Sequence, residues 1–417
     1  MNRRIIFHID VNSAFLSWNA VYALQHGAKV DLRELPSIVG GNQATRHGIV
    51  LAKSIPAKKY GIQTGEPIVS ALKKCPNLIV TPPDYLLYMK CSEAMLEILR
   101  EYSDKVQIFS IDECFMDMTC MHSLLGGDYK KIAEEIKNRI KNELGFTVSI
   151  GISTNKLLAK MGSDLEKPDA VVTLFPEEIK EKMWPLPVRD LYMCGNATEK
   201  KLHSMGIYTI GDLAHAEPRY LIYKLKSWGE MLYNFAHGIE SSPVNPNGSI
   251  PYIKGIGNSC TISFDVEDHE TAHKVLLSLV ETVSMRLRRG NFCCRLVQVS
   301  IKTNELISYS HQRKLEVPTD CTNAIYEEAC RLFDNTWKGE PIRHLGVRVS
   351  DLCGNDFIQL SLFDKNWEKH RLIDRAVDEI RMKYGSHSVF RAGFLHSRLA
   401  PLQGGIVEDF PVMSSIL

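Results

Sequence analysis

Short apolar runs and longer amphipathic stretches alternate along the first third of the chain. Compact apolar runs predict strands, and apolar positions three or four residues apart predict helices. The predicted elements are a strand at 4–10, helices at 12–25 and 85–102, a strand hairpin at 106–118, a helix at 128–144 and a strand at 147–152. This order matches a ferredoxin-like sheet with helices on one side. A stretch rich in Gly, Lys and Pro, residues 36–83, interrupts it after the first strand.

A stretch rich in proline, glycine and serine divides the rest of the chain. Residues 186–216, which precede it, predict short helices joined by turns, and residues 240–255 predict a linker. Strands and helices then alternate from residue 258 to 351, which predicts a second α+β domain, and a further helix is expected at 366–384. A length of 417 residues suggests two to four domains.

Composition narrows the class of protein. The content of 44% hydrophobic and 24% charged residues is that of a globular protein. The net charge is +1, so any contact with a polyanion has to come from local basic patches. The 11 cysteines form no C-x-x-C pair, and we expect reduced, mostly buried thiols. We see no signal-peptide core and no run as long as a membrane span, and therefore expect a cytoplasmic location.

Three carboxylates are expected to meet at one edge of the first sheet. Asp10 ends the first strand, and Asp112 and Glu113 lie near the tip of the hairpin. Magnesium is bound by one or two carboxylates together with water and phosphate oxygens, and a pair of such ions serves in-line phosphoryl transfer. The same residues also suit ordinary turns. A sheet of this type serves either a polymerase or a nucleotide cyclase.

Three segments carry a family resemblance. They are HIDVNSAF at 8–15, SIDECF at 110–115 and GISTNKLLAKMGSDLEKP at 151–168. Together they resemble the Y-family DNA polymerases, the translesion enzymes. Among these, the sequence is similar to bacterial DNA polymerase IV and to the catalytic subunit of polymerase V. The motifs lie in the family's order and spacing, and the resemblance covers nearly the whole chain.

The resemblance implies a right-hand polymerase of the α+β class. Such an enzyme has a ferredoxin-like palm, small fingers, a helical thumb and a separate α+β little finger. The implied boundaries are 1–15 and 82–176 for the palm, 16–81 for the fingers, 177–240 for a helix-hairpin-helix-like thumb, 241–255 for a linker, 256–357 for the little finger and 358–417 for a C-terminal tail.

The resemblance also implies roles for single residues. Asp10, Asp112 and Glu113 match the family's catalytic, metal-binding carboxylates, with two Mg²⁺ ions as cofactors. The backbone carbonyl of Val11 would be a further ligand. Phe15 matches the steric gate, an aromatic ring under the sugar that leaves no room for a ribose 2′-hydroxyl.

Nucleotide contacts are implied for two lysines. Lys58 and Lys167 match positions that contact the incoming triphosphate. The chain departs from polymerase IV here, because Ile55 stands where that enzyme has a tyrosine and Lys58 where it has an arginine. A lysine keeps the charge but loses the bidentate fork of an arginine. We therefore expect the triphosphate contacts to differ from those of polymerase IV.

Contacts with duplex DNA should go mainly to phosphates, since a template-copying enzyme accepts any sequence. The turn at Gly195 is one candidate. A second is a basic cluster of Arg286, Arg288, Arg289 and Arg295 in the second domain. Acidic residues slightly outnumber basic ones across that domain, so a mixed, solvated surface is the alternative for each arginine.

The segment QLSLF lies just beyond the second domain. Gln359, Leu360, Leu362 and Phe363 match the pentapeptide by which bacterial polymerases bind the sliding clamp. The alternative is a short strand that packs on the domain. Clamp binding would supply processivity through a high effective concentration.

The hypothesis is a template-directed translesion DNA polymerase. It would extend primer-template DNA with deoxynucleoside triphosphates and act as a monomer. No segment resembles a proofreading exonuclease, so we expect low fidelity, and the family implies damage bypass, DNA repair, a mutator effect and the SOS response. Two alternatives remain, a catalytically inactive family member that serves as a clamp-bound DNA scaffold and a nucleotide cyclase on the same palm.

Overall fold

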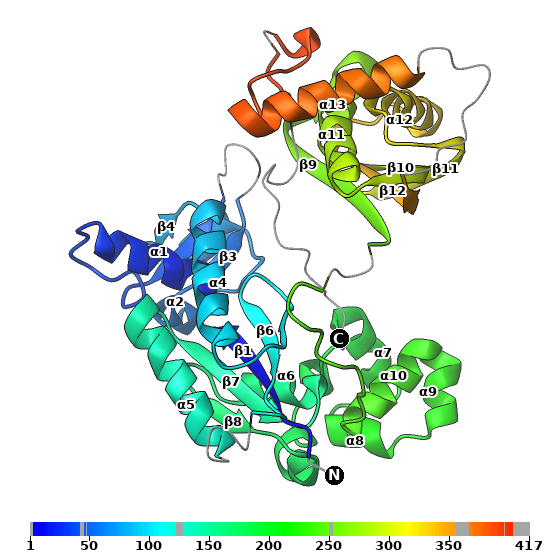
Figure 1. The fold of residues 1–417 in the computed structure, drawn as a ribbon. Coiled ribbons are helices and arrows are strands. Elements are labelled where there is room, and N and C mark those ends of the chain that lie inside the picture. Colours follow the sequence, from blue (N-terminus) through cyan, green and yellow to red (C-terminus); the bar gives the residue numbers. More distant parts are fainter. Residues whose placement is uncertain are drawn as a thin grey trace. The chain divides into compact units, whose positions relative to one another are not determined.

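A computed structural model describes residues 3–41, 46, 48–121, 128–249, 253–355, 367–395 and 397–402. The chain forms two compact units, one of Met1–Gly41 with Ile49–Pro251 and one made chiefly of Tyr252–Phe410 (Figure 1). Each unit has its own buried apolar core. The predicted α+β class is confirmed. The division between the units lies within the stretch predicted as a linker.

The central sheet of the first unit has the strand order β5-β6-β1-β7-β8. Its strands are β1 (Ile6–Val11), β5 (Val106–Ile108), β6 (Glu113–Asp117), β7 (Val148–Ser153) and β8 (Val171–Thr173). The order of the first four is that of a ferredoxin-like sheet, and β8 is added in parallel beside β7. Every residue of β1 is buried, because β1 is the middle strand and helices cover both faces of the sheet.

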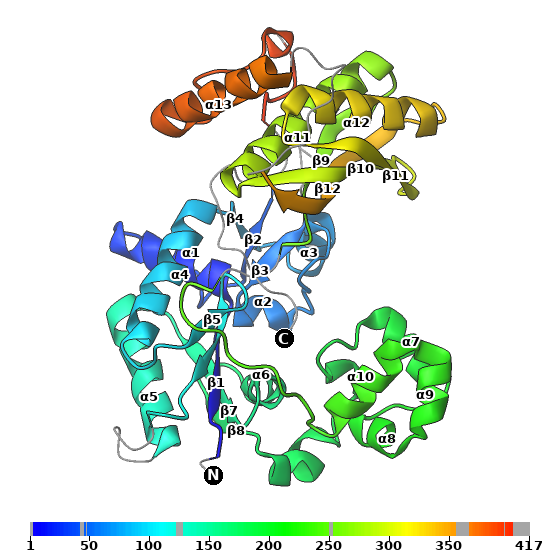
Figure 2. The same cartoon turned by 45° about the vertical axis from the view of Figure 1, so that its right-hand side comes forward.

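Helices lie on both faces of this sheet. They are α1 (Ala14–Gln25), α4 (Tyr85–Arg100), α5 (Tyr129–Arg139) and α6 (Lys156–Leu165). Figure 2 shows α4 and α5 on one face and α6 on the other. The prediction of helices on one side is therefore wrong, because the helix that follows β7 packs on the opposite face of the sheet. The side chains of Asp84, Asp128 and Asn155 cap α4, α5 and α6, each by accepting a hydrogen bond from a first-turn backbone N–H.

Two further parts complete the first unit. A small sheet with the order β3-β2-β4 is packed with two short helices around Ile38, Val50 and Ile68. Its elements are β2 (Ser37–Gly40), β3 (Val50–Lys53), α2 (Ile55–Lys59), α3 (Ile68–Lys74) and β4 (Ile79–Thr81). A helical part follows β8 and consists of α7 (Asn196–His203), α8 (Ile210–His215), α9 (Pro218–Leu225) and α10 (Ser227–Ala236).

The second unit is an antiparallel sheet with the order β11-β10-β12-β9. Its elements are β9 (Gly255–Val266), α11 (His269–Arg289), β10 (Phe292–Thr303), β11 (Ser308–Thr319), α12 (Thr322–Thr336) and β12 (Ile342–Gly354). The helices α11 and α12 contribute Leu276, Ile325 and Phe333 to the apolar core over the sheet.

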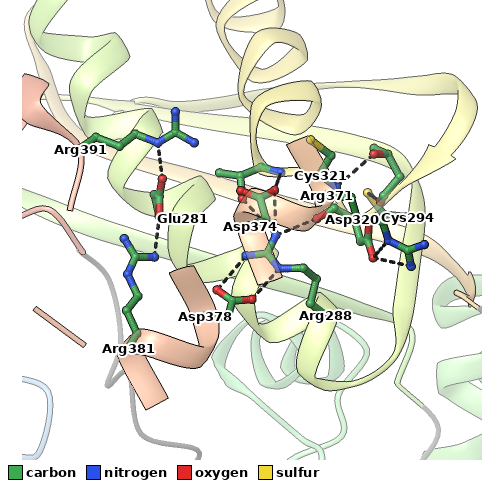
Figure 3. Close-up of polar contacts among 12 residues, drawn as sticks. Glu281, Arg288, Cys294, Asp320, Cys321, Arg371, Asp374, Asp378, Arg381 and Arg391 are labelled. Carbon is green, nitrogen blue, oxygen red and sulfur yellow. Dashed lines mark hydrogen bonds and ion pairs between the residues drawn. The ribbon is translucent and has the colours of Figure 1, made fainter. Parts of the chain in front are cut away.

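A last helix, α13 (Trp367–Tyr384), packs on the second unit through charged side chains. Figure 3 shows the guanidinium of Arg288 in α11 between Asp374 and Asp378 of α13. Arg288 donates to both carboxylate oxygens of Asp378, at 2.6 and 3.0 Å. A second group joins Arg381 of α13 to Glu281 of α11 at 2.7 Å. The tail helix is therefore attached to the second unit by buried ion pairs.

This packing corrects one expectation about DNA contacts. Arg288 was predicted to belong to a basic surface cluster, but its side chain is only 7% exposed and is neutralised by Asp374 and Asp378. The sequence pattern missed this because the two acids lie far along the chain, in α13. Arg286 and Arg295 are exposed, as a DNA contact requires.

Within the described residues, no helix is both long enough and apolar enough to cross a membrane.

Candidate active site

The pairing of β1 with β6 brings the three predicted carboxylates to one end of the sheet. Asp10 lies directly opposite Glu113 in the register of the two strands. The backbone N–H of Val11 donates to the carbonyl of Asp112 at 3.0 Å, which fixes the hairpin end against the end of β1. All three side chains are largely buried, with Asp10 only 7% exposed.

A cavity of about 280 Å³ opens beside two of these acids. Asp10, Val11 and Asp112 line one part of it, and Phe15 and Lys53 line another. Its remaining lining residues are Ser13, Ala14, Leu51, Ala52 and Thr64. Carboxylates, an aromatic ring and a lysine therefore face the same space. This combination suits a ligand with phosphate groups, a sugar and bound cations.

Two lysines balance the charge of the acids. Lys160 of α6 donates to both carboxylate oxygens of Glu113, at 2.9 Å each. Lys167 lies 3.0 Å from the carboxylate of Asp10 and 2.8 Å from that of Asp164. Buried carboxylates are costly without such partners. A cation that enters the site has to compete with these ammonium groups.

Burial and these neighbours shift the pKa of each group. Burial raises the pKa of the Asp10 carboxyl to about 8, although Lys167 acts to lower it. Burial also raises the pKa of Asp112. At Glu113 burial acts in the same direction, but His8, which is protonated in the acidic range where Glu113 titrates, and Lys160 outweigh it and hold the pKa of Glu113 below the usual value. The site therefore stabilises the charged form of Glu113 most strongly.

His8 is a buried neighbour of Glu113 that the sequence analysis did not select. Burial lowers its pKa to about 4, so the ring is neutral at pH 7. Its Nδ1 lies 2.7 Å from the hydroxyl of Ser163, and that hydroxyl already donates to the carbonyl of Lys160. Nδ1 must then be the donor, which leaves the lone pair of Nε2 facing Glu113 at 3.8 Å.

Phe15 lies at the start of α1 and lines the cavity. Its half-buried ring stacks on Tyr88 with a centroid distance of 4.4 Å and an interplanar angle of 6°. Tyr85 contacts it edge-on at 6.0 Å. Ser13, which precedes the helix, has φ of 49°, and this left-handed turn separates the direction of α1 from that of β1. Tyr88 therefore supports one face of the Phe15 ring, and the ring also lines the cavity.

The two lysines predicted to contact the triphosphate, Lys58 and Lys167, lie in different surroundings. Lys58 is exposed on α2 and does not line the cavity, whereas Lys53 does. Burial and the charge of Lys58 lower the pKa of Lys53. Ile55, at the start of α2, is also exposed.

Lys53 and Lys160 are the main residues that the sequence analysis left out of the site. The signal for Lys160 was available, because Lys160 lies in the same motif segment as Lys167, and both follow the buried strand 147–152. The QLSLF segment, including Gln359, Leu360, Leu362 and Phe363, lies outside the described residues.

Known protein families match this chain in separate ranges that correspond to parts of the structure. The impB/mucB/samB family matches residues 9–164, its C-terminal domain matches residues 253–362, and the family's HHH motif matches residues 176–207. DNA polymerase IV of Clostridium acetobutylicum is 47% identical over 94% of this chain and 98% of its own length. The chain belongs to the Y-family of DNA-directed DNA polymerases.

Other relatives of this Y-family polymerase support the same assignment. DNA polymerase IV of Acetivibrio thermocellus is 42% identical over 95% of this chain and 98% of its own. DNA polymerase IV 1 of Bacillus subtilis is 37% identical over 96% and 95%. The predicted family is thus confirmed, and the nucleotide cyclase alternative loses its support.

The fold also matches solved Y-family structures. A Y-family DNA polymerase chimera, Dbh-Dpo4(243-245)-Dbh, aligns with a TM-score of 0.70 and 22% identity over 84% of this chain and 100% of its own. A Dbh ternary complex aligns with a TM-score of 0.56 and 22% identity over 83% and 98%. At this identity the likeness concerns the fold alone, and it agrees with the predicted right-hand architecture.

Proposed function

We propose that this Y-family member is a translesion DNA polymerase that adds deoxynucleotides to a primer 3′-end under the direction of a template. One observation carries the proposal: Asp10, Asp112 and Phe15 face a single cavity, with Glu113 beside Asp10. The relatives that align over nearly the whole chain are named DNA polymerase IV. The inactive-scaffold alternative is disfavoured because all three acids are present at one end of the same sheet.

The carboxylates suit divalent cations. Asp10, Asp112 and Glu113, with the carbonyl of Val11, would hold two Mg²⁺ ions, since carboxylate and carbonyl oxygens are the donors that this ion prefers. When bound, the ions lower the pKa of the attacking hydroxyl and neutralise charge on the phosphates. Glu113 would join the site by exchanging its contact with Lys160, which holds both of its oxygens in this structure.

The cavity walls would orient the nucleotide. Phe15 would lie under the deoxyribose and exclude a 2′-hydroxyl, because Tyr88 prevents its ring from retreating. Lys167 would turn from Asp10 toward the triphosphate, and Lys53 and Lys58 would add positive charge on the finger side. These lysines act as point charges, which is the consequence of lacking the arginine fork.

The partners follow from the same proposal. Primer-template DNA would contact backbone amides near Gly195 and exposed arginines such as Arg286 and Arg295. The QLSLF segment, which connects β12 to α13, would bind the bacterial sliding clamp. The enzyme would work as a monomer in the cytoplasm, with low fidelity, in damage bypass and repair.

A primer-extension assay with the Asp112→Asn variant tests the catalytic centre. We expect extension to fall at least about a hundredfold, the scale of losing one preorganised electrostatic group, with DNA binding unchanged. Asp104→Asn, a substitution at an exposed acid in the same unit, should retain wild-type extension. Equal extension by wild type and Asp112→Asn would reject this site, and no extension by wild type would favour the scaffold.

A further inference from the structure

A cluster of two histidines and an aspartate lies in the second unit, whereas the residues of the proposed catalytic centre belong to the first unit. His269 and His273 are on the first turns of α11, and Asp334 is on the last turn of α12. Their possible ligand atoms all lie within 4.8 Å of one another. In the part of the chain that the structure describes, this is the one group of three such side chains that meets this spacing.

The three side chains of the cluster are already arranged like the ligands of a metal ion. His269 Nδ1 and His273 Nε2 both lie 2.8 Å from the same oxygen, Oδ1 of Asp334. The two histidines are four residues apart on one helix, and this spacing places both imidazoles on one face toward a shared ion. Three donors from two helices therefore point to one place.

Aromatic packing holds the two imidazole rings in place. The His269 ring meets Trp337 edge-on at 4.8 Å and Phe333 at 5.8 Å, and the His273 ring meets Phe333 at 5.9 Å. Phe333 is fully buried in the core of the unit. Because the rings are fixed on a rigid surface, little side-chain entropy remains to be lost when an ion binds.

The cluster is open to solvent. The side chains of His269, His273 and Asp334 are 57%, 28% and 42% exposed, so an ion can reach them.

We propose that His269, His273 and Asp334 bind a transition-metal ion of the Zn²⁺ type. Two imidazole nitrogens and one carboxylate oxygen are a usual donor set for zinc, with water in the fourth position, whereas Mg²⁺ prefers oxygen donors alone. The bound ion would replace the two hydrogen bonds to Asp334 and link α11 to α12. The site is independent of the proposed catalytic centre.

Titration of chelator-treated, full-length protein with ZnCl₂ tests this site. Calorimetry at pH 7.5 should show one Zn²⁺ per chain, and Zn²⁺ should raise the unfolding temperature because it binds the folded state. Asp334→Asn, which keeps the side-chain volume, and His273→Ala should each weaken binding tenfold or more. His311→Ala removes an exposed histidine elsewhere in the unit and should bind like wild type.

Two further measurements make the result decisive. The Asp112→Asn background should still bind the ion, which separates this site from the carboxylates of the first unit. Co²⁺ used as a probe should give an absorption band that Asp334→Asn weakens. Equal Zn²⁺ affinity in wild type, Asp334→Asn and His273→Ala would overturn the proposal, and so would binding by wild type only at a large excess of metal.

Discussion

The orientation of the Phe15 ring is fixed by contacts with neighbouring side chains more than by its position in α1. Its ring stacks on Tyr88, which is fully buried and whose hydroxyl donates to Asn19. Stacked rings in contact are stabilised by about 0.5–1.5 kcal/mol beyond the area they bury. The position of the ring relative to the cavity is therefore rigid, as the proposed filter for the sugar requires.

Replacing Phe15 with alanine should weaken discrimination against ribonucleotides. The ratio of kcat/KM for a deoxynucleotide to that for its ribonucleotide should fall by roughly 10–200-fold, the range for one small group in a fitted pocket. Single-nucleotide incorporation kinetics measure this ratio. Phe15→Tyr keeps the ring and should keep discrimination. An unchanged ratio in Phe15→Ala would remove Phe15 from this role.

At the scale of elements, α6 reaches the active site because β7 has a glycine opposite it. A Cβ added at Gly151 would overlap the backbone of α6 at Ala159 and Ser163. The close approach brings Lys160 to Glu113 and Ser163 to His8. One small residue in the middle of a buried strand thus sets the position of the charged groups.

The Gly151→Ala variant should therefore lose stability and activity together. Overpacking against a backbone costs about 1–3 kcal/mol or more, and α6 would move away from the carboxylates. Denaturant unfolding and primer extension measure the two effects. Gly162→Ala is a matched control on the same interface, since its Cβ would find its nearest atom at an ordinary 3.4 Å and the helix would gain from alanine. Wild-type stability in Gly151→Ala would contradict this account.

The helix α13 packs with its charged face inward. Asp374, Asp378 and Arg381 are buried, while Ile373 and Tyr384 are exposed. An amphipathic pattern by itself favours the opposite orientation. The buried charges of α11 and the loop before α12 decide the outcome, because leaving them unpaired would cost more than exposing a few apolar side chains.

Arg288→Met should detach α13 from the second unit. Asp374 and Asp378 would remain buried without their cation, at a cost of about 3–5 kcal/mol. Hydrogen exchange should show lost protection in α13 and unchanged protection in β1 and β7. Arg295→Met, at an exposed arginine of the same unit, should leave exchange unaltered. Full protection of α13 in Arg288→Met would show that the ion pairs are not what holds it.

At the scale of the whole molecule, the chain joins two independently packed units through residues near 251. The first unit contains the proposed catalytic centre and the second contains the attached helix α13. The proposed clamp-binding segment connects β12 to α13, and both of these elements belong to the second unit. The described elements on either side of this segment thus belong to one folded body.

Substituting Leu362 and Phe363 with alanine should abolish stimulation by the clamp. Synthesis without the clamp should continue at the wild-type rate, because the substitutions leave every residue that lines the catalytic cavity unchanged. The number of nucleotides added per binding event, with and without clamp, measures the effect, which arises from lost effective concentration. Leu372→Ala, at an exposed leucine on α13, serves as the control. Stimulation that persists in the double variant would place clamp binding elsewhere.

The sequence by itself determined the α+β class, the order of the palm elements and the family, because apolar periodicity and motif order are local properties. It also selected Asp10, Asp112, Glu113 and Phe15. Only the tertiary structure decided which cations meet these acids and which arginines are available to DNA. Lys160 and Arg288 owe their surroundings to segments distant in the chain, and the pairing of buried charges depends on distances in space that no local pattern contains.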